Sequence, residues 1–524
     1  MMKKLLILSL LVLLVGSMGL AQDEKVLVIG HAESTDSLDP ANGFTQTTGV
    51  INRVTYDTLV TFPDDNAASI EPMLAESWEI SEDGTEYTFS LREDIIFHDG
   101  SPMTASDVVF SINRLKNLNG NPSFLADGID SVEAMDDYTV VFTLPSNRPS
   151  FLAEMTNYAF SVSSQALVEA NGGTSADDAA EADSAESFLN GLSVGTGPYI
   201  LDLWEPQQRT ELIVNPNFWG DAPYFDRVII VNIPEAAAQS QALVAGDIDI
   251  ALDLSAEQVN ALEGNDDITL TRNPSQLVHF ILMNEDEEIG GPFSDPLVQE
   301  AVRLGLDYNG YVDLWGGVVP GTNMSAILPG AYSSEDGTAM VRDVDRAMEL
   351  LAEAGYPDGL EVTLDYPDFT FQGVNMNTNA QKIQSDLADI GITVTIAPAE
   401  LQVSLDEYRN GQQGFSYWFW GPDILDSADF LSFLPGGKVA EERLNWNADG
   451  ADADLLDLID AARTAVDQDE RMALYGELQD YAQCCGPYAP FNQPAVQYAV
   501  GSDIENFIWH PQWLLDVSIL SRSE

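Results

Sequence analysis

The sequence is poor in cysteine, in histidine and in positive charge. It contains 2 cysteines and 4 histidines among 524 residues, and 21 lysines and arginines stand against 85 aspartates and glutamates. The formal net charge of −64 at pH 7 excludes a nucleic acid or an anionic lipid surface as a partner, because both are themselves negatively charged. The histidines are far apart and show no metal-site spacing, so we expect no metal and no other cofactor.

Motifs of catalysis are also missing. The sequence has no GxSxG elbow, no Walker-type phosphate loop and no grouping of a nucleophilic serine or cysteine with histidine. Paired carboxylates are typical of glycosidases, but a chain so rich in acids places carboxylates near one another everywhere. We therefore predict a protein that is not an enzyme, and keep an exported hydrolase as the alternative.

The two cysteines are neighbours, Cys484 and Cys485. In an oxidising compartment they can form a vicinal disulfide, and otherwise they are two buried thiols. The sequence leaves both alternatives open. Neither cysteine has the basic neighbour that a nucleophilic thiolate needs.

The N-terminal segment has the layout of a secretory signal peptide. Lys3 and Lys4 precede an apolar run from Leu5 to Val15, and small residues follow up to Ala21. The run is shorter than the roughly 20 residues that span a membrane. We predict a signal peptide at 1–21 without a lipid-anchor cysteine, and hence a periplasmic or secreted protein.

Patterns along the chain indicate an α/β protein of roughly three domains. Residues 78–94 alternate about an Asp83–Gly84 turn, which predicts a hairpin, and Thr104 begins a capped helix. Residues 171–187 are small and acidic, which predicts a solvated loop or a surface insertion. Further on, a strand at 360–365, a helix at 377–390 and a strand at 392–396 follow one another. This order predicts a sheet covered by helices.

An aromatic block, Tyr417 to Trp420, runs into Gly-Pro-Asp. As a strand it places Trp418 and Trp420 on one face and Tyr417 and Phe419 on the other. One face is expected in the core and the other toward a cleft or a neighbouring element. Asp423 follows the strand directly, where α/β sheets bind ligands.

Seven segments together resemble the family 5 extracellular solute-binding proteins, the dipeptide-, oligopeptide- and nickel-binding class of ABC importers. In order they are SLDP at 37–40, YTFSLREDIIFHDGSPMTASDVVFSINR at 87–114, GTGPY at 195–199, NPNFWGDAPYFDRV at 215–228, ALVAGDIDIA at 242–251, AMELLAEAGYPDGLEVTL at 347–364 and WGPD at 420–423. Residues 87–114 are the most specific, because they join a hairpin, an FHDG turn and a capped helix in a fixed order. The resemblance covers nearly all of the chain after residue 21.

The resemblance implies an α/β, periplasmic-binding-protein-like fold with two lobes joined by a two-strand hinge near 272–284 and 492–500, plus an extra inserted domain (cluster C type). Domain I is expected to comprise 22–62, 192–274 and 498–524. Domain II, the family insertion, is expected at 63–191, and domain III at 275–497. Such a protein, expected to be a monomer, captures a solute between domains I and III and delivers it to membrane permease subunits.

The resemblance also implies ligand contacts. In peptide-binding members the aspartate of the W-x-x-D segment pairs with the peptide's α-ammonium group, which corresponds to Asp423 here, with Trp420 beside it. The loop Phe44, Thr45, Gln46 and Thr47 corresponds to the stretch that bonds the ligand backbone as a strand does. Arg409 is the expected partner of a ligand carboxylate by rough alignment.

The sequence departs from the family at one of these positions. Some oligopeptide binders have an arginine where this chain has Tyr417, which puts a free ligand carboxylate in doubt. Aromatic walls formed by Tyr417, Trp418 and Trp420 suit the rings of a sugar equally well. We therefore expect a peptide as the solute and keep an oligosaccharide or another small organic solute as the alternative.

The acidic composition generates a prediction about salt. Self-repulsion among so many carboxylates opposes folding unless counter-ions screen it. We expect the midpoint of thermal unfolding to rise as NaCl is added, as in a protein adapted to a saline exterior. A midpoint that does not change with NaCl would contradict this hypothesis.

Overall fold

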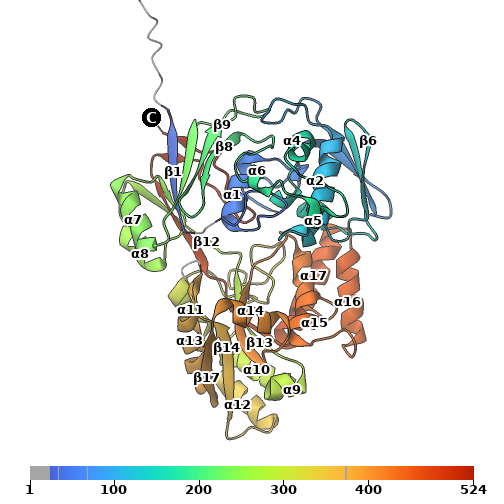
Figure 1. The fold of residues 1–524 in the computed structure, drawn as a ribbon. Coiled ribbons are helices and arrows are strands. Elements are labelled where there is room, and N and C mark those ends of the chain that lie inside the picture. Colours follow the sequence, from blue (N-terminus) through green and yellow to red (C-terminus); the bar gives the residue numbers. More distant parts are fainter. Residues whose placement is uncertain (1–23, 33–34, 68, 372–373, 524) are drawn as a thin grey trace, which may run out of the picture.

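The computed structural model describes residues 24–523 except 33–34, 68 and 372–373, so the predicted signal peptide at 1–21 lies outside the described residues. The described chain builds three main sheets of seven, four and five strands. In Figure 1 the seven-stranded and four-stranded sheets lie in the upper half, and the five-stranded sheet with its helices lies below them.

The seven-stranded sheet has the order β12-β20-β11-β1-β10-β9-β8. Its strands are β1 (Val26–His31), β8 (Tyr199–Glu205), β9 (Arg209–Val214), β10 (Arg227–Asn232), β11 (Ile250–Ala251), β12 (Ile268–Pro274) and β20 (Ala495–Gly501). The helices between them are α1 (Gln46–Thr55), α7 (Ala236–Ala245) and α8 (Ala256–Leu262). Alternate residues of β1, Leu27 and Ile29, are fully buried in the core of this sheet, as the period of two in a strand requires.

The four-stranded sheet is antiparallel and has the order β4-β5-β7-β6. It comprises β4 (Ala75–Ile80), β5 (Glu86–Leu91), β6 (Ser131–Asp136) and β7 (Thr139–Thr143). The predicted hairpin is confirmed as β4 and β5. The capped helix is confirmed as α2 (Ala105–Leu118), where the Thr104 backbone N–H donates to Asp107 Oδ2 at 2.9 Å. Short helices surround the sheet, namely η1 (Ser123–Ala126), α3 (Phe151–Glu154), η2 (Tyr158–Phe160), α4 (Gln165–Ala170), α5 (Ala179–Ala182) and α6 (Glu186–Leu189).

The five-stranded sheet has the order β17-β14-β18-β13-β19. Its strands are β13 (Val278–Met283), β14 (Leu360–Pro367), β17 (Ile392–Ala399), β18 (Phe415–Trp420) and β19 (Tyr488–Asn492). The predicted strand, helix and strand at 360–396 are confirmed as β14, α13 and β17, with β14 parallel to β17.

Helices follow the strands of this sheet, and four two-stranded ladders complete the described structure. The helices are α9 (Glu287–Gly290), η3 (Gly291–Ser294), α10 (Pro296–Gly305), α11 (Tyr308–Trp315), α12 (Val344–Glu353), α13 (Met376–Ala388), α14 (Leu401–Arg409), η4 (Ser427–Phe433), α15 (Lys438–Leu444), α16 (Ala453–Thr464) and α17 (Gln468–Cys484). The ladders pair β2 (Val60–Thr61) with β3 (Glu71–Pro72), β15 (Thr370–Phe371) with β16 (Val374–Asn375), β21 (Ile504–Glu505) with β24 (Ser521–Arg522), and β22 (Trp509–His510) with β23 (Leu514–Leu515).

The chain crosses between the seven-stranded and five-stranded sheets twice, once between β12 and β13 and once between β19 and β20. The two crossings lie side by side. β12 pairs with β20 in one sheet, and their continuations β13 and β19 pair in the other. The two crossings also bond to each other, because the Ser275 N–H donates to the Pro494 carbonyl at 2.8 Å. The predicted two-lobe fold with a two-strand hinge is confirmed. The residue boundaries of the three domains stay a prediction.

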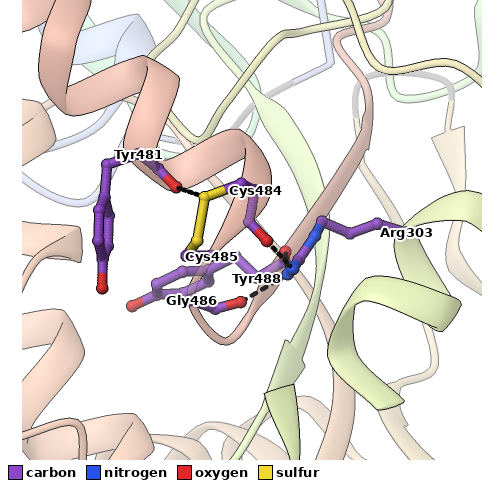
Figure 2. Close-up of a disulfide and its surroundings, with 6 residues drawn as sticks. All are labelled: Arg303, Tyr481, Cys484, Cys485, Gly486 and Tyr488. Carbon is purple, nitrogen blue, oxygen red and sulfur yellow. Dashed lines mark hydrogen bonds between the residues drawn. A yellow bond between two sulfur atoms is a disulfide. The ribbon is translucent and has the colours of Figure 1, made fainter. Parts of the chain in front are cut away.

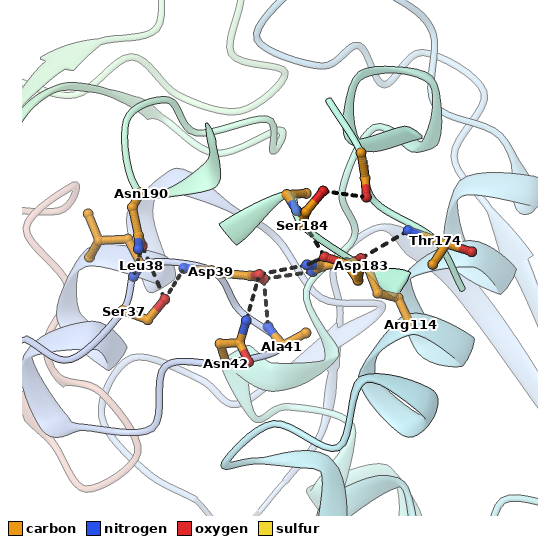
Figure 3. Close-up of polar contacts among 12 residues, drawn as sticks. Ser37, Leu38, Asp39, Ala41, Asn42, Arg114, Thr174, Asp183, Ser184 and Asn190 are labelled. Carbon is orange, nitrogen blue, oxygen red and sulfur yellow. Dashed lines mark hydrogen bonds and ion pairs between the residues drawn. The ribbon is translucent and has the colours of Figure 1, made fainter. Parts of the chain in front are cut away.

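Buried Arg114 of α2 joins three segments that are far apart in the sequence (Figure 3). Its two terminal nitrogens donate to the two carboxylate oxygens of Asp39, each at 2.7 Å, and Nε donates to Asp183 Oδ2 at 2.8 Å. Asp183 belongs to residues 171–187. Most residues of this stretch are exposed, as the predicted solvated loop or surface insertion requires, but the stretch also contains α5 and turns the Asp183 side chain inward to a buried cation.

We expect Arg114→Ala to lower the free energy of unfolding by about 3–5 kcal/mol, because Asp39 and Asp183 would be left buried without a counter-charge. Denaturant unfolding followed by far-UV circular dichroism measures the change. The control is Arg346→Ala, whose pairs with Glu349 and Glu353 are exposed, so that little change is expected. Equal losses in the two variants would contradict the anchoring role of Arg114.

Candidate functional site

A cavity of about 420 Å³ lies between the two lobes, in front of the crossings. Its lining residues are Phe44, Thr45, Gln46, Asn157, Tyr158, Gln276, Leu277, Phe419, Gly421, Pro422, Asp423, Leu425, Pro511, Gln512 and Leu514. They come from the segment before α1, from η2, from the first crossing, from the loop after β18 and from the C-terminal segment. Its volume is within the range of about 300–1,000 Å³ typical of small-molecule sites.

The upper wall is the start of α1. Thr45 is the N-cap residue, and its Oγ1 accepts the Thr48 N–H at 3.2 Å. The hydroxyl of Tyr158 donates to the Thr45 carbonyl at 3.2 Å, so η2 fixes this turn from the side. Gln46 and Thr47 are already helical, and Thr47 is buried outside the lining. Of the predicted stretch 44–47, Phe44, Thr45 and Gln46 line the cavity and Thr47 does not, and strand-like bonding of a ligand to this stretch stays a prediction.

The lower wall is formed by Phe419 of β18 and by the loop that follows this strand. Tyr417 lies deep in the core behind it. Its hydroxyl bonds to His279 Nδ1 at 2.6 Å and accepts from Asn379 Nδ2 at 2.7 Å. Trp418 is buried on the opposite face of the sheet, where its indole donates to Gln413 Oε1 at 2.8 Å. Neither ring lines the cavity, in contrast to the predicted ligand contact, because helices cover both faces of this sheet.

Trp420 is not among the lining residues either. It belongs to a column of stacked side chains behind the cavity, formed with Trp418, Tyr408 and Arg443. Trp418 stacks on Tyr408 with ring centroids 4.3 Å apart, and the Arg443 guanidinium lies 4.6 Å from the Tyr408 ring and 4.9 Å from the Trp420 ring. Cation–π attraction holds the guanidinium between the two rings. Trp420 therefore supports the loop that carries Asp423 and does not form its surface.

Asp423 lines the cavity and makes no ion pair with any described residue. Burial raises the pKa of its carboxyl group, and the positive charges of Arg443 and Lys438 act in the opposite direction. Its contact with a ligand stays a prediction.

Arg409 is exposed at the end of α14 and is not among the lining residues. The predicted carboxylate partner therefore does not lie at this cavity.

Several lining residues lie outside the segments that the sequence singled out. They are Asn157, Tyr158, Leu425, Pro511, Gln512 and Leu514. Each comes from an ordinary loop or turn without a motif. Only the packing of distant segments brings them to the cleft, so the sequence offered no pattern by which to find them.

The two cysteines are joined by a disulfide at the end of α17, which is the first of the two alternatives (Figure 2). Arg303, 1% exposed, donates to the carbonyls of Cys484 and Gly486 at 2.7 and 2.6 Å. Gly486 has φ +107°, a backbone conformation that favours glycine. The disulfide thus belongs to a tight turn between α17 and β19, remote from the cavity lining.

Within the described residues, no three His, Cys, Asp or Glu side chains gather in a way that could hold a metal ion. The described helices also include none with the length and apolarity that crossing a membrane requires.

The chain matches the description of a known protein family. The description "Bacterial extracellular solute-binding proteins, family 5 Middle" matches residues 69–441. The chain is a family 5 solute-binding protein. The resemblance predicted from the seven segments is confirmed, and the interlobe cavity is the place where such a protein holds a solute.

Three proteins illustrate the relationship. This solute-binding protein is 28% identical over 521 residues to the probable D,D-dipeptide-binding periplasmic protein DdpA of Escherichia coli K12, covering 96% of this chain and 95% of that one. It resembles DppA from Helicobacter pylori in complex with the peptide STSA, with TM-score 0.77, 27% identity and coverage of 96% and 99%. It also resembles AgaA from A. tumefaciens R10 in complex with agropinic acid, with TM-score 0.75, 25% identity and coverage of 95% and 99%.

We expect Tyr417→Phe to destabilise this solute-binding protein without changing solute affinity. Loss of the hydroxyl leaves Asn379 and His279 buried with one partner fewer, at a cost of about 1–3 kcal/mol. Denaturant unfolding and calorimetric binding measure the two effects. The control is Tyr138→Phe, whose hydroxyl has no described partner. A loss of affinity with unchanged stability would mean that Tyr417 contacts the solute.

Proposed function

We propose that this protein captures a short peptide with a free ammonium terminus between its lobes and delivers it to the permease of an ABC importer. The observation that carries the proposal is Asp423, an unpaired carboxylate in the interlobe cavity. The printed names of DdpA and of the DppA complex with a peptide support the same class of solute. Export through the predicted signal peptide at 1–21, without a lipid anchor, belongs to this proposal.

The chemistry of anchoring follows from burial. A carboxylate that has lost part of its water and has no cationic partner gains most from a cation that enters with hydrogen-bond donors of its own. A primary ammonium group supplies three such donors. Asp423 lies in the short loop after β18, and the pairing of β18 with β13 fixes the start of that loop before the ligand arrives.

Capture is coupled to closure of the lobes. Phe44 and Thr45 belong to the segment before α1 in the upper lobe, while Phe419 and Asp423 belong to the lower lobe. A solute that contacts both walls stabilises the closed arrangement over the open one. The closed form then presents a distinct shape to the permease. The cavity lining contains no histidine and one carboxylate, so we propose binding without catalysis.

The lining contains no lysine or arginine. A peptide's C-terminal carboxylate therefore has no cationic partner in the cavity, and a peptide amide should bind about as well as the free acid.

Aromatic rings at Phe44, Tyr158 and Phe419 favour the second candidate, a sugar-derived or other small organic solute. The AgaA complex with agropinic acid supports that alternative.

We expect Asp423→Asn to weaken binding of a free-amine peptide by about 30-fold or more, because an ammonium group would lose its counter-charge in a partly buried site. Isothermal titration with trialanine measures the affinity, and N-acetyl-trialanine should bind poorly to both proteins. The matched variant is Asp449→Asn, which removes an exposed carboxylate from the same lobe. Equal affinity of the Asp423→Asn variant and the native protein would exclude the amine anchor, and a stronger response to an oligosaccharide panel would favour the second candidate.

A further inference from the structure

A second carboxylate, Asp429, lies directly behind Asp423. It belongs to η4 and is 8% exposed. Its Oδ1 accepts the Asp423 backbone N–H, and its Oδ2 accepts the Trp420 indole N–H, both at 3.2 Å. One side chain thus ties together the two ends of the W-G-P-D loop. Asp429 does not line the cavity and cannot touch a solute there.

Neither Asp423 nor Asp429 forms an ion pair with a described lysine or arginine. Asp426, the next acid in the loop, is already held by both terminal nitrogens of Arg471 from α17. Arg443 of α15 is held between the Tyr408 and Trp420 rings and forms no ion pair with a described residue. Lys438, also of α15, is exposed. The positive charge nearest to the pair therefore acts at a distance.

We propose that Asp423 and Asp429 act as one unit, which holds a single proton while the cleft is empty and releases it to solvent when an ammonium group of the solute binds. Asp429 is then a positioning residue that also sets the charge preference of the site. The inference rests on the proposed function, because it assigns the ammonium group to Asp423.

The physical reason is the cost of two adjacent negative charges away from water. Neighbouring carboxylates in a site of low polarity do not both ionise easily, and they titrate as a pair. Burial raises the pKa of Asp429 well above its usual range, and the charge of Asp423 raises it further. An arriving ammonium group supplies the missing positive charge, so the pair ionises fully and the proton departs.

The sign of the pH dependence follows. Binding that releases a proton is weakened when protons are abundant, so affinity for an ammonium group falls as the pH falls through the range in which the empty pair is protonated. The limit is about tenfold for each pH unit, since at most one proton is exchanged. A solute without an ammonium group releases no proton, and its affinity does not follow this dependence.

The test in the empty protein uses Trp420 as a reporter, because its indole N–H bonds directly to Asp429. The 9 tryptophans are labelled with ¹⁵N, and the Trp420 resonance is assigned with Trp420→Phe. We expect this resonance to titrate at a pH above the ordinary range of an aspartate. In Asp429→Asn it should stay constant, while Glu442→Gln, which removes an exposed carboxylate of α15, should leave the titration unchanged. A native resonance that stays constant above the ordinary pH range of an aspartate overturns the proposal, and the Trp420→Phe variant used for assignment is the one variant that must fold for this result.

Calorimetry of trialanine in phosphate and in bis-Tris, which both buffer near the pH of the experiment and have different heats of protonation, counts the protons released on binding. We expect up to about one proton near pH 6 in the native protein and none in Asp429→Asn. Binding of trialanine without proton release overturns the inference and leaves the amine anchor intact. An indole titration as expected, together with no binding of trialanine, contradicts the proposed function and leaves the shared proton intact.

Discussion

The architecture depends on one constraint, namely that the two lobes are joined through two adjacent crossings of the chain. β12 and β20 pair above the crossings, and β13 and β19 pair below them, so both ladders end where the lobes meet. Gln493 adds a second bond between the crossings by donating to the Ser275 carbonyl at 2.5 Å. In the proposed closure of the lobes the crossings would bend as one unit, and the cavity would change its width without breaking a sheet.

The aromatic block has a mechanical role within this arrangement. Its rings pack into the cores on both faces of the five-stranded sheet and into the column with Arg443. This packing fixes the start of the W-G-P-D loop, and Asp429 fixes its end. The rigid support places a single carboxylate at the rim of the sheet. In the proposed function, recognition rests on Asp423, and the four aromatic residues mostly hold its loop in place.

Local patterns predicted the elements that local physics determines. The hairpin at β4 and β5 follows from alternation about a turn, and α2 follows from its cap at Thr104. The sequence could also locate Asp423 after a strand. It could not show that both faces of that strand are covered, which buries Tyr417 and Trp418, nor that Arg114 turns Asp183 inward. Those outcomes depend on contacts between segments far apart in the sequence, such as Arg114 and Asp183, which are 69 positions apart, or on helices packed over the sheet, and no local pattern encodes them.

The bond between Cys484 and Cys485 has a consequence for how the chain matures after export. With 2 cysteines in the sequence, oxidation has a single intramolecular outcome, so no rearrangement among wrong pairings delays folding. A bridge between neighbours closes almost no loop and therefore restricts the unfolded chain very little. Its effect is local, on the turn that Arg303 holds before β19. Maturation thus needs an oxidant at this one turn and no catalyst of disulfide exchange.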